Sequence, residues 1–303
     1  MTAILITRAG PLCTVQDAGR FGMLRHGISA SGPMDKGAFE RAAMWLGGAG
    51  GAGIEFTTAG LSFTVEGGPL GAAFDGGSFT LKRNGEASAV WPTRLVLRDG
   101  DVVDVSPGPY SNYGYVRFDR ELDLPLVLNS RATNTVAGLG GLEGRALRQG
   151  DRLAFGEMTA RGPSLHPSAA GPEEGPIRVI WGLHADLFDA ATRERFAGEA
   201  FRISSRIDRM GARLEDQTGV FSGLAALSLV SDAVVAGDIQ ILGDGTPIVL
   251  LRDHQPTGGY PRIATVISPD IDRFVQMRPG AEVRFEPVSL AKAHALAAGR
   301  RAR

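Results

Sequence analysis

The sequence predicts a mainly β protein with a few short helices. Short apolar runs alternate with glycine, proline, asparagine and aspartate along most of the 303 residues, which is typical of short strands joined by turns. Glycine contributes 42 residues, roughly twice its ordinary share and without a collagen-like period. Segments with helical periodicity are few. Strands at this spacing favour barrels or sandwiches.

The predicted strands are short and apolar. Residues 1–8 predict an opening strand rather than a signal peptide, because no long apolar core follows a basic leader. The Arg83-Asn84-Gly85-Glu86 segment predicts a tight hairpin, since Asn-Gly adopts the positive φ angles of a two-residue turn. Further strands are predicted at 61–65, 78–81, 95–97, 102–105, 177–181, 248–251 and 283–285.

Three segments predict short helices. Residues 34–46 carry apolar side chains at helical spacing, with Asp35 near the start and Gly47-Gly48 at the end. The other two candidates are residues 185–197 and 290–298.

Composition and context exclude several classes of function. The single cysteine, Cys13, can form neither an intramolecular disulfide nor a cysteine-ligated zinc site. None of the three lysines lies in a GxxxxGK[ST] phosphate-binding loop. Gly48-x-Gly50-x-x-Gly53 matches a dinucleotide fingerprint, but it follows a predicted helix and precedes a strand, the reverse of the order that such a site needs. A formal charge of −1 gives no electrostatic reason to expect nucleic acid.

Neither a metal site nor a membrane span is expected. The five histidines occur singly, without an HxH or HExxH pair, and a lone histidine is more often structural than a ligand. No apolar run approaches the roughly 18–20 residues that cross a bilayer. The sequence therefore predicts a cytoplasmic protein.

The length favours two domains, since one domain usually takes roughly 100–200 residues. Residues 156–176 are rich in proline, glycine, alanine and serine and predict a linker. The predicted domains are 1–155 and 177–303. A faint colinear repeat supports duplication of one barrel: Ser31 and Asp35 recur as Ser204 and Asp208.

Polar residues in the first part of the chain predict part of a functional site. Residues 14–20 supply Gln16, Asp17 and Arg20, and residues 27–35 supply Ser31 and Gly32. Backbone N–H groups near Ser31-Gly32 and the following helix start would face an anion. The alternative is an ordinary loop in which Asp17 pairs with Arg20 and a side chain caps the helix.

Two further polar segments lie in the second part. Residues 205–213 place three arginines around Asp208, which predicts either surface ion pairs or guanidinium groups that hold a carboxylate or phosphate. The segment 253–261 leaves an apolar strand and carries many donors and acceptors, with two glycines that permit close backbone approach to a ligand. A plain turn would need far less varied chemistry.

These segments together resemble a known family. TVQDAGRFG with SGPMDKGAF, then DRMGARL, PIVLLRDHQPTGGYPRIATVI and RPGAEVRF, are similar to the allophanate hydrolase subunit 2 family, also described as the biotin-dependent carboxyltransferase family, which includes the C-type subunit of 5-oxoprolinase. The resemblance runs from about residue 10 to residue 288, with the motifs in family order. It implies two tandem cyclophilin-like β-barrel domains.

The resemblance also implies a function within a complex. The expected partners are a protein of the allophanate hydrolase subunit 1 type, which corresponds to the B-type subunit of 5-oxoprolinase, and an amidohydrolase-like A-type subunit. Together they would open 5-oxoproline, a small amide substrate, to glutamate with ATP, which the complex binds. The alternatives are a carboxyltransferase subunit of a urea or amide carboxylase, with carboxybiotin carried on another chain, and a regulatory protein that antagonises a kinase inhibitor.

The sequence departs from the family at three positions of the last segment. His254 stands where an arginine is usual, Pro256 replaces the first of two threonines, and Arg262 replaces a lysine. Arginine keeps the charge but does not titrate as lysine can.

We expect the site residues to come from the polar loops. The candidate catalytic residues, which would act as general bases or orient charge, are Asp253, Asp208 and Asp17. The candidate substrate-binding residues are Gln16, Arg20, Ser31, Gly32, Arg209, Arg213, Gln255, Thr257, Gly258, Gly259 and Tyr260. These loops would line a groove that the partner protein completes, and no lysine lies among them to act as a nucleophile.

Overall fold

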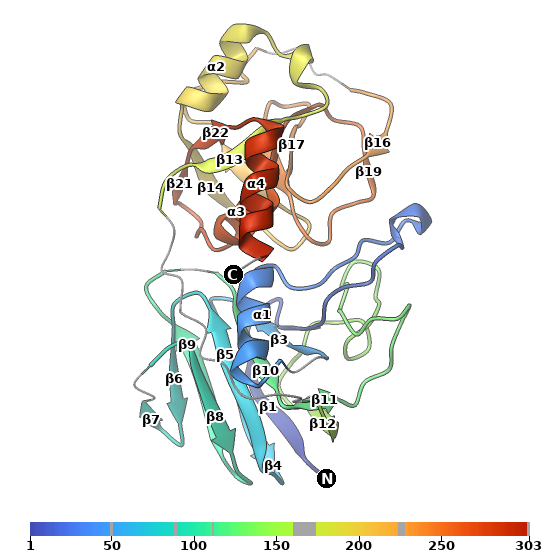
Figure 1. Cartoon of the computed structure of the whole chain (residues 1–303), viewed down its shortest axis with the longest axis vertical. Coiled ribbons are helices and arrows are strands. Elements are labelled where there is room, and N and C mark those ends of the chain that lie inside the picture. The colour runs from blue at the N-terminus through green and yellow to red at the C-terminus, as the bar shows by residue number, and fades with distance from the viewer. Residues whose placement is uncertain (49–50, 88–89, 111, 160–173, 224–227, 302–303) are drawn as a thin grey trace. The chain divides into compact units, whose positions relative to one another are not determined.

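The protein is mainly β, as the sequence predicts. The structure is a computed structural model that describes residues 1–48, 51–87, 90–110, 112–159, 174–223 and 228–301. Short strands joined by turns make up most of the described chain, and helices are few (Figure 1).

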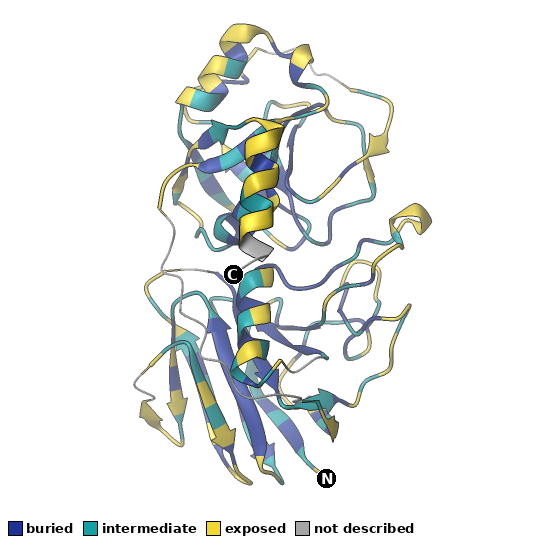
Figure 2. Ribbon diagram, viewed as in Figure 1, coloured by how far each residue is buried: buried dark blue, intermediate teal, exposed yellow. Residues whose placement is uncertain are grey.

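Strand burial follows the apolar pattern. In Figure 2 the strand β5 (Leu70–Gly76) is largely dark blue, whereas the C-terminal helix α4 (Leu290–Arg301) is mostly yellow along the part that is described. Edge strand β8 (Thr93–Leu97) alternates between exposed and half-buried residues before it ends at buried Leu97. This is the period-2 pattern of a strand with one face toward the core.

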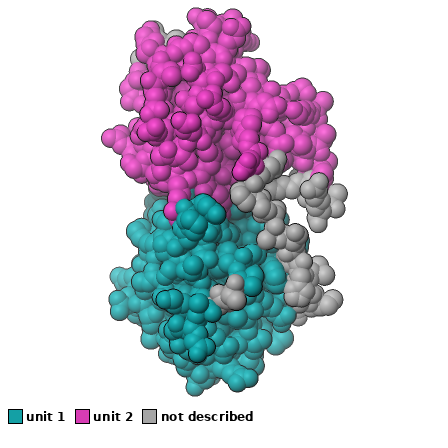
Figure 3. Space-filling view, turned by 90° about the vertical axis from the view of Figure 1, so that its left-hand side faces the viewer, with its two compact units in different colours: residues 1–22, 30–170 teal, residues 23–29, 171–303 magenta. Residues whose placement is uncertain are grey.

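The chain forms two compact units, coloured separately in Figure 3. Unit 1 comprises Met1–Gly22 and Ala30–Ala170, and unit 2 comprises Met23–Ser29 and Gly171–Arg303. Of the predicted linker, residues 160–173 lie outside the described residues, and residues 156–158 are the end of a strand. The domain boundaries 1–155, 156–176 and 177–303 stay a prediction.

The described part of unit 1 contains two antiparallel sheets. The buried residues of both sheets form one hydrophobic cluster that includes Ile4, Phe56, Phe63 and Phe118. The larger sheet has the order β11 (Arg120–Leu122), β12 (Arg152–Met158), β1 (Ala3–Ala9), β4 (Leu61–Glu66), β9 (Val102–Pro107), β6 (Phe79–Arg83) and β7 (Glu86–Ala87). The smaller has the order β2 (Thr14–Gln16), β3 (Gly53–Phe56), β10 (Gly114–Phe118), β5 and β8.

Local predictions in unit 1 are confirmed. Lys82 pairs with Ala87 and Arg83 with Glu86, and the turn residues Asn84 and Gly85 have φ of 54° and 85°, as an Asn-Gly hairpin requires. Helix α1 (Lys36–Trp45) is capped by Asp35, whose carboxylate accepts a hydrogen bond from the Ala38 N–H at 2.9 Å. Strand β3 follows this helix, which confirms the reversed context of the glycine motif; positions 49–50 of the motif lie outside the described residues.

Unit 2 contains an eight-stranded sheet and a separate two-stranded sheet among its described residues. The larger sheet has the order β21 (Glu282–Val283), β14 (Phe201–Ile207), β15 (Gly211–Glu215), β18 (Pro247–Leu250), β17 (Asp238–Ile241), β20 (Arg262–Val266), β13 (Ile177–Trp181) and β22 (Phe285–Pro287). The smaller pairs β16 (Asp232–Ala233) with β19 (Thr257–Gly258).

One segment closes the larger sheet into a barrel-like form. We expected a single strand at 283–285, but the chain pairs as β21 with β14 at one end of the sheet order and as β22 with β13 at the other. Only Arg284 separates these two strands, and its carbonyl accepts a hydrogen bond from the Ile177 N–H at 2.8 Å. Because consecutive residues pair with both ends of the sheet, the ends are brought together.

The helices of unit 2 differ in part from expectation. The predicted helix at 185–197 divides into the 3₁₀ turn η2 (Ala185–Leu187) and α2 (Ala190–Gly198), because Asp189 begins a new helix by accepting the Thr192 N–H at 2.7 Å. Helix α4 confirms the prediction at 290–298. Helix α3 (Ser268–Val275), which has proline in its first turn, was not predicted.

A further 3₁₀ turn, η1 (Leu24–His26), lies in the part of unit 2 that precedes α1 in the sequence.

Two glycine substitutions test the packing of unit 1. Gly60 and Gly85 both have positive φ, at 73° and 85°, but a Cβ at Gly60 would lie 2.0 Å from the Val105 carbonyl oxygen whereas one at Gly85 would meet nothing within 4 Å. Gly85→Ala should cost about 1–2 kcal/mol for the left-handed backbone alone. Gly60→Ala should cost more, as measured by urea unfolding. Equal losses of unfolding free energy in the two variants would contradict the close approach of the Val105 carbonyl to Gly60 in the β3–β4 turn.

Candidate functional site

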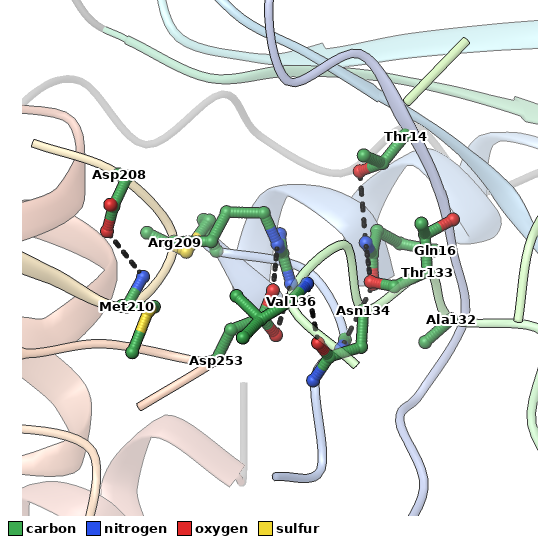
Figure 4. A network of polar contacts seen from close by, with 12 residues as sticks. Thr14, Gln16, Ala132, Thr133, Asn134, Val136, Asp208, Arg209, Met210 and Asp253 are labelled. Atoms are coloured by element: carbon green, nitrogen blue, oxygen red, sulfur yellow. Dashed lines mark hydrogen bonds and ion pairs between the residues drawn. The ribbon is translucent and has the colours of Figure 1, made fainter. Parts of the chain in front are cut away.

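Gln16 joins three segments of unit 1. It lies at the end of β2, and its side chain is buried. The amide nitrogen donates to Thr14 Oγ1 and to the Thr133 carbonyl, both at 3.0 Å, while Oε1 accepts the Gly32 N–H at 3.1 Å. Figure 4 shows Gln16 beside Thr14 and Thr133. The side chain therefore shapes this loop cluster.

Asp17 organises the neighbouring loop. Oδ1 accepts hydrogen bonds from the Gly19 N–H at 2.9 Å and the Ser130 hydroxyl at 2.6 Å, and Oδ2 accepts the Arg131 N–H at 2.6 Å. Both carboxylate oxygens are thus engaged. The alternative, ordinary-loop interpretation paired Asp17 with Arg20, and that pairing is wrong: the Asp17 carboxylate binds Ser130 and Arg131 instead.

Arg20 is a buried residue that holds backbone carbonyls. It is 1% exposed, its Nη2 donates to the Ala132 carbonyl at 2.6 Å, and its Nε donates to the Val127 carbonyl at 3.3 Å. Because a guanidinium group offers five N–H donors in a fixed plane, one side chain can fasten two segments of a loop.

Ser31 combines backbone strain with a hydroxyl that has no partner. Its φ is 57°, in the left-handed region that non-glycine residues rarely adopt. Its Oγ is buried and makes no hydrogen bond with any of the described residues. Gly32 follows with φ of 88°. Such strain concentrates at functional positions, where the surrounding structure imposes it.

The helix start next to Ser31 does not offer free donors to an external anion. The N–H groups of Met34 and Asp35 donate to Glu55 Oε2 and to the Tyr115 hydroxyl oxygen, both at 2.7 Å. The Tyr115 hydroxyl in turn donates to Glu55 Oε2 at 3.0 Å. The expectation of an anion site at these amides is therefore wrong, because a buried carboxylate of the protein already occupies that place.

Sequence reasoning missed Glu55 and Tyr115. Both are fully buried, on strands β3 and β10 whose described residues are buried throughout. Burial, followed by the neighbouring Glu55 carboxylate, raises the pKa of Tyr115 well above its ordinary value. The available signal was a lone glutamate inside the apolar run Ile54-Glu55-Phe56, since a carboxylate in a buried strand requires internal partners.

In unit 2, Arg209 and Asp253 form a buried ion pair. Nε donates to Oδ2 at 2.8 Å and Nη2 to Oδ1 at 3.3 Å, with side chains 2% and 0% exposed. The Asp253 N–H also donates to the Arg209 carbonyl at 2.8 Å. The two side chains face each other in Figure 4. The pair fastens the β14–β15 turn to the loop that follows β18.

Asp208 is exposed and shapes the β14–β15 turn. Its Oδ1 accepts the N–H groups of Met210 at 2.7 Å and Gly211 at 3.1 Å (Figure 4), while Oδ2 accepts no hydrogen bond from the described residues. Arg213 lies within β15, opposite Ile248, and is half-buried. The arginine in this segment that binds an aspartate is therefore Arg209, and its partner is the distant Asp253.

The residues after Asp253 lead into the two-stranded sheet. The Gln255 amide donates to Gln240 Oε1 at 3.5 Å, and Thr257 and Gly258 form β19. A Cβ at Gly258 would lie 2.4 Å from Gln240 Nε2, so the close approach that this glycine permits is to the protein's own amide. The Gly259 carbonyl accepts the Leu229 N–H at 2.8 Å, and the exposed Tyr260 follows.

The predicted site residues thus fall into two groups, one in each unit. Gln16, Asp17, Arg20, Ser31 and Gly32 belong to unit 1, and the other candidates belong to unit 2. A groove lined by both groups of residues stays a prediction. Within the described ranges, no group of three or more histidine, cysteine, aspartate or glutamate side chains is arranged to hold a metal ion. No helix there is both long and apolar enough to cross a membrane.

Comparison with known proteins identifies related chains. Residues 26–287 match the model of the carboxyltransferase domain, subdomain A and B. The chain is 33% identical over 299 residues to the C-type subunit of 5-oxoprolinase from Escherichia coli, covering 95% of this chain and 92% of that protein. It is 34% identical over 286 residues to the C-type subunit of 5-oxoprolinase from Haemophilus influenzae, covering 92% and 89%.

A solved structure shares the fold. The urea amidolyase of Kluyveromyces lactis superimposes with a TM-score of 0.88 and 26% sequence identity. The superposition covers 99% of this chain but 19% of the urea amidolyase chain, so this chain spans about a fifth of that longer relative.

The buried ion pair of unit 2 can be tested by removing its cation. Arg209→Met should cost about 3–5 kcal/mol of unfolding free energy, because it leaves the Asp253 carboxylate buried without its cationic partner. The matched control is Arg193→Met, also in unit 2, where Arg193 pairs with the fully exposed Asp186 at 2.9 Å. That change should cost about 0–1 kcal/mol. Similar losses in denaturant unfolding would show that the Arg209 pair contributes no more than a surface pair.

Proposed function

The chain belongs to the carboxyltransferase domain, subdomain A and B family, and from this we propose that it is one component of a multi-subunit 5-oxoprolinase. The observation that carries the proposal is the length of the match. Both relatives that are C-type subunits of 5-oxoprolinase align with this chain along 89% or more of their own length. A chain that aligns with nearly the whole length of these subunits is suited to the role of the C-type subunit in such a complex.

The proposed complex converts 5-oxoproline, ATP and water to glutamate, ADP and phosphate. In this proposal the chain acts with a B-type subunit and with an amidohydrolase-like A-type subunit, and ATP binds at the level of the complex. The substrate is a small cyclic amide that also carries a carboxylate. Recognition of such a molecule calls for hydrogen-bond donors to its oxygens and for a base that assists proton transfer.

Asp208 is the best placed of the three candidate bases. Both carboxylate oxygens of Asp17 accept hydrogen bonds, from Ser130 and Arg131. Both carboxylate oxygens of Asp253 accept hydrogen bonds from Arg209. Asp208 is exposed and uses Oδ1 for the turn, while Oδ2 accepts no hydrogen bond from the described residues. In the proposal Asp208 accepts or shuttles a proton, and the Arg209–Asp253 pair holds the turn that presents it.

A second candidate function is carboxyl transfer. The likeness to urea amidolyase, at a TM-score of 0.88, favours it. Because this chain corresponds to 19% of that protein, carboxybiotin would be delivered from another chain. In that reaction an amide nitrogen of the substrate would receive the carboxyl group, and the same polar loops would bind the amide.

The proposed base is tested by Asp208→Asn in the assembled complex. Asparagine keeps the side-chain oxygen that caps the turn but removes the negative charge, so kcat for glutamate production should fall about 100-fold or more. Asp244→Asn is the matched control, because the exposed Asp244 caps another turn of unit 2 by accepting the Thr246 N–H at 2.9 Å. We expect the control to retain full activity.

Two outcomes would contradict the proposal. Full activity of Asp208→Asn would remove Asp208 from the chemistry. If the purified wild-type complex consumed carboxybiotin in the presence of urea or another amide, and produced no glutamate from 5-oxoproline and ATP, carboxyl transfer would replace 5-oxoprolinase as the function.

Ser31 allows stability and activity to be separated. Ser31→Gly relieves the left-handed strain of about 1–2 kcal/mol and removes a hydroxyl that makes no hydrogen bond with the described residues. The entropy of the unfolded glycine offsets roughly 0.5–1 kcal/mol of that gain. Thermal unfolding should therefore show no loss of stability, while glutamate production falls if Ser31 binds substrate. A variant with wild-type kcat and KM would remove Ser31 from the site.

A further inference from the structure

A two-stranded element of unit 2, here called the flap, carries several of the predicted substrate-binding residues. The flap comprises residues 228–235 and 256–260, with strands β16 and β19 at its centre. Two further backbone hydrogen bonds join its arms: the Leu229 N–H donates to the Gly259 carbonyl at 2.8 Å and the Val234 N–H to the Pro256 carbonyl at 3.1 Å. It forms a sheet separate from the eight-stranded sheet.

Arg262 fastens the flap to the large sheet. This residue is the first of β20, and it is 7% exposed. Nη1 donates to the Ala233 carbonyl at 2.6 Å, and Nη2 donates to Asp232 Oδ2 at 2.7 Å. Nη1 also lies 3.5 Å from Asp238 Oδ2 on β17. Asp232 and Ala233 are the two residues of β16, so one guanidinium group holds an entire strand of the flap.

His184 lies behind the same guanidinium group. Its Nδ1 accepts hydrogen bonds from the Arg262 backbone N–H at 3.3 Å and from Arg262 Nε at 3.4 Å, and the His184 backbone N–H donates to the Arg262 carbonyl at 3.2 Å. This arrangement requires a neutral ring whose Nδ1 carries a lone pair. Protonation would remove that acceptor and place a second cation against Arg262.

The charges around His184 come from three strands. Burial, followed by the Arg262 cation on β20, lowers the pKa of His184, whereas Asp232 on β16 and Asp238 on β17 act in the opposite direction. Because the pKa of His184 in the folded protein lies below the ordinary value near 6.5, its ring is neutral in the folded protein at neutral pH. The neutral His184 ring contributes its full share of stability above about pH 6.5, and this contribution is lost as the pH falls toward the pKa of His184 in the folded protein.

We propose that Arg262 is a positioning residue that latches the flap, so that Thr257, Gly258 and Tyr260 are held in place for substrate, with neutral His184 completing the latch. The proposal rests on the proposed function only for the identity of the substrate. The latch itself is a property of unit 2. Arginine suits this role because its planar fork reaches a carbonyl, a carboxylate and an imidazole at once, which a single ammonium group cannot do.

The latch is tested by amide hydrogen exchange on the full-length protein. Two variants weaken it: Arg262→Lys removes the fork and keeps the charge, and Asp232→Asn removes the ion pair at a side chain that is 51% exposed, which leaves the folded core intact. The Leu229 and Val234 amides, whose hydrogen bonds join the arms, should exchange at least about 10-fold faster in both. Arg193→Lys changes an exposed pair of the same unit and should leave these amides unchanged.

A pH series separates the latch from general destabilisation. In the wild type, flap exchange corrected for intrinsic rates should accelerate as the pH falls below about 6.5. In His184→Gln, whose side chain does not titrate, the corrected rate should be independent of pH. Unchanged exchange at Leu229 and Val234 in both Arg262→Lys and Asp232→Asn, or a pH response that persists in His184→Gln, would overturn the proposal.

Kinetics on the assembled complex connect the latch to substrate. Arg262→Lys and Asp232→Asn should raise KM for 5-oxoproline about 10-fold with a smaller change in kcat, since they loosen binding residues and leave Asp208 in place. Faster flap exchange with unchanged KM would overturn the role of the latch in substrate binding. A wild-type complex without 5-oxoprolinase activity would refute the proposed function instead, and the exchange result would still decide the latch.

Discussion

The organisation of both units depends on a single requirement: polar groups that are buried among strands and loops must find hydrogen-bond partners inside the protein. In unit 1, Glu55 meets this requirement by accepting the Met34 N–H and the Tyr115 hydroxyl, which sets the entry to helix α1. In unit 2, Arg209 and Asp253 meet it together. Each solution ties segments that are far apart in the sequence, so loops that carry many polar residues have defined shapes.

The same requirement separates residues that support the site from residues that can act in it. Gln16, Asp17, Arg20 and Asp253 each form hydrogen bonds with the protein's own backbone or side chains. Ser31 and Asp208 differ. The strained serine keeps a hydroxyl without a partner among the described residues, and the exposed aspartate keeps one carboxylate oxygen that accepts no hydrogen bond from them. Chemistry in the proposed complex would use these remaining groups, on a framework that the first set holds rigid.

Family relationship and geometry support different parts of the functional interpretation. The match of residues 26–287 to the carboxyltransferase model shows the family, and the related proteins include both C-type subunits of 5-oxoprolinase and a urea amidolyase. Choosing between the two proposed reactions depends on the rest of the complex rather than on the fold, because a fold hosts different reactions through changes at its site. The flap and its latch at Arg262 are features of this chain that either reaction could use to hold an amide substrate.

Local patterns in the sequence were sufficient for several elements. The Asn84-Gly85 hairpin and the Asp35-capped helix depend on backbone preferences of a few adjacent residues, and both were predicted correctly. Strand β5 was missed because its run of glycine and alanine has little intrinsic strand preference, although pairing with β10 and β8 makes it a central strand. The site could be predicted as a set of polar loops, but the partner of each residue could not.

By itself, the sequence determined the mainly β class, the Asn84-Gly85 turn, the Asp35 cap and the loops that carry the polar chemistry, because each of these depends on neighbours a few residues apart. Only the tertiary structure decided that Asp253 binds Arg209, that Glu55 fills the place expected for an external anion, and that Arg262 holds the flap. These pairings join residues between 21 and 44 positions apart. The identity of such partners depends on strand register and on the need to neutralise buried charge. Neither can be inferred from a local pattern in the sequence.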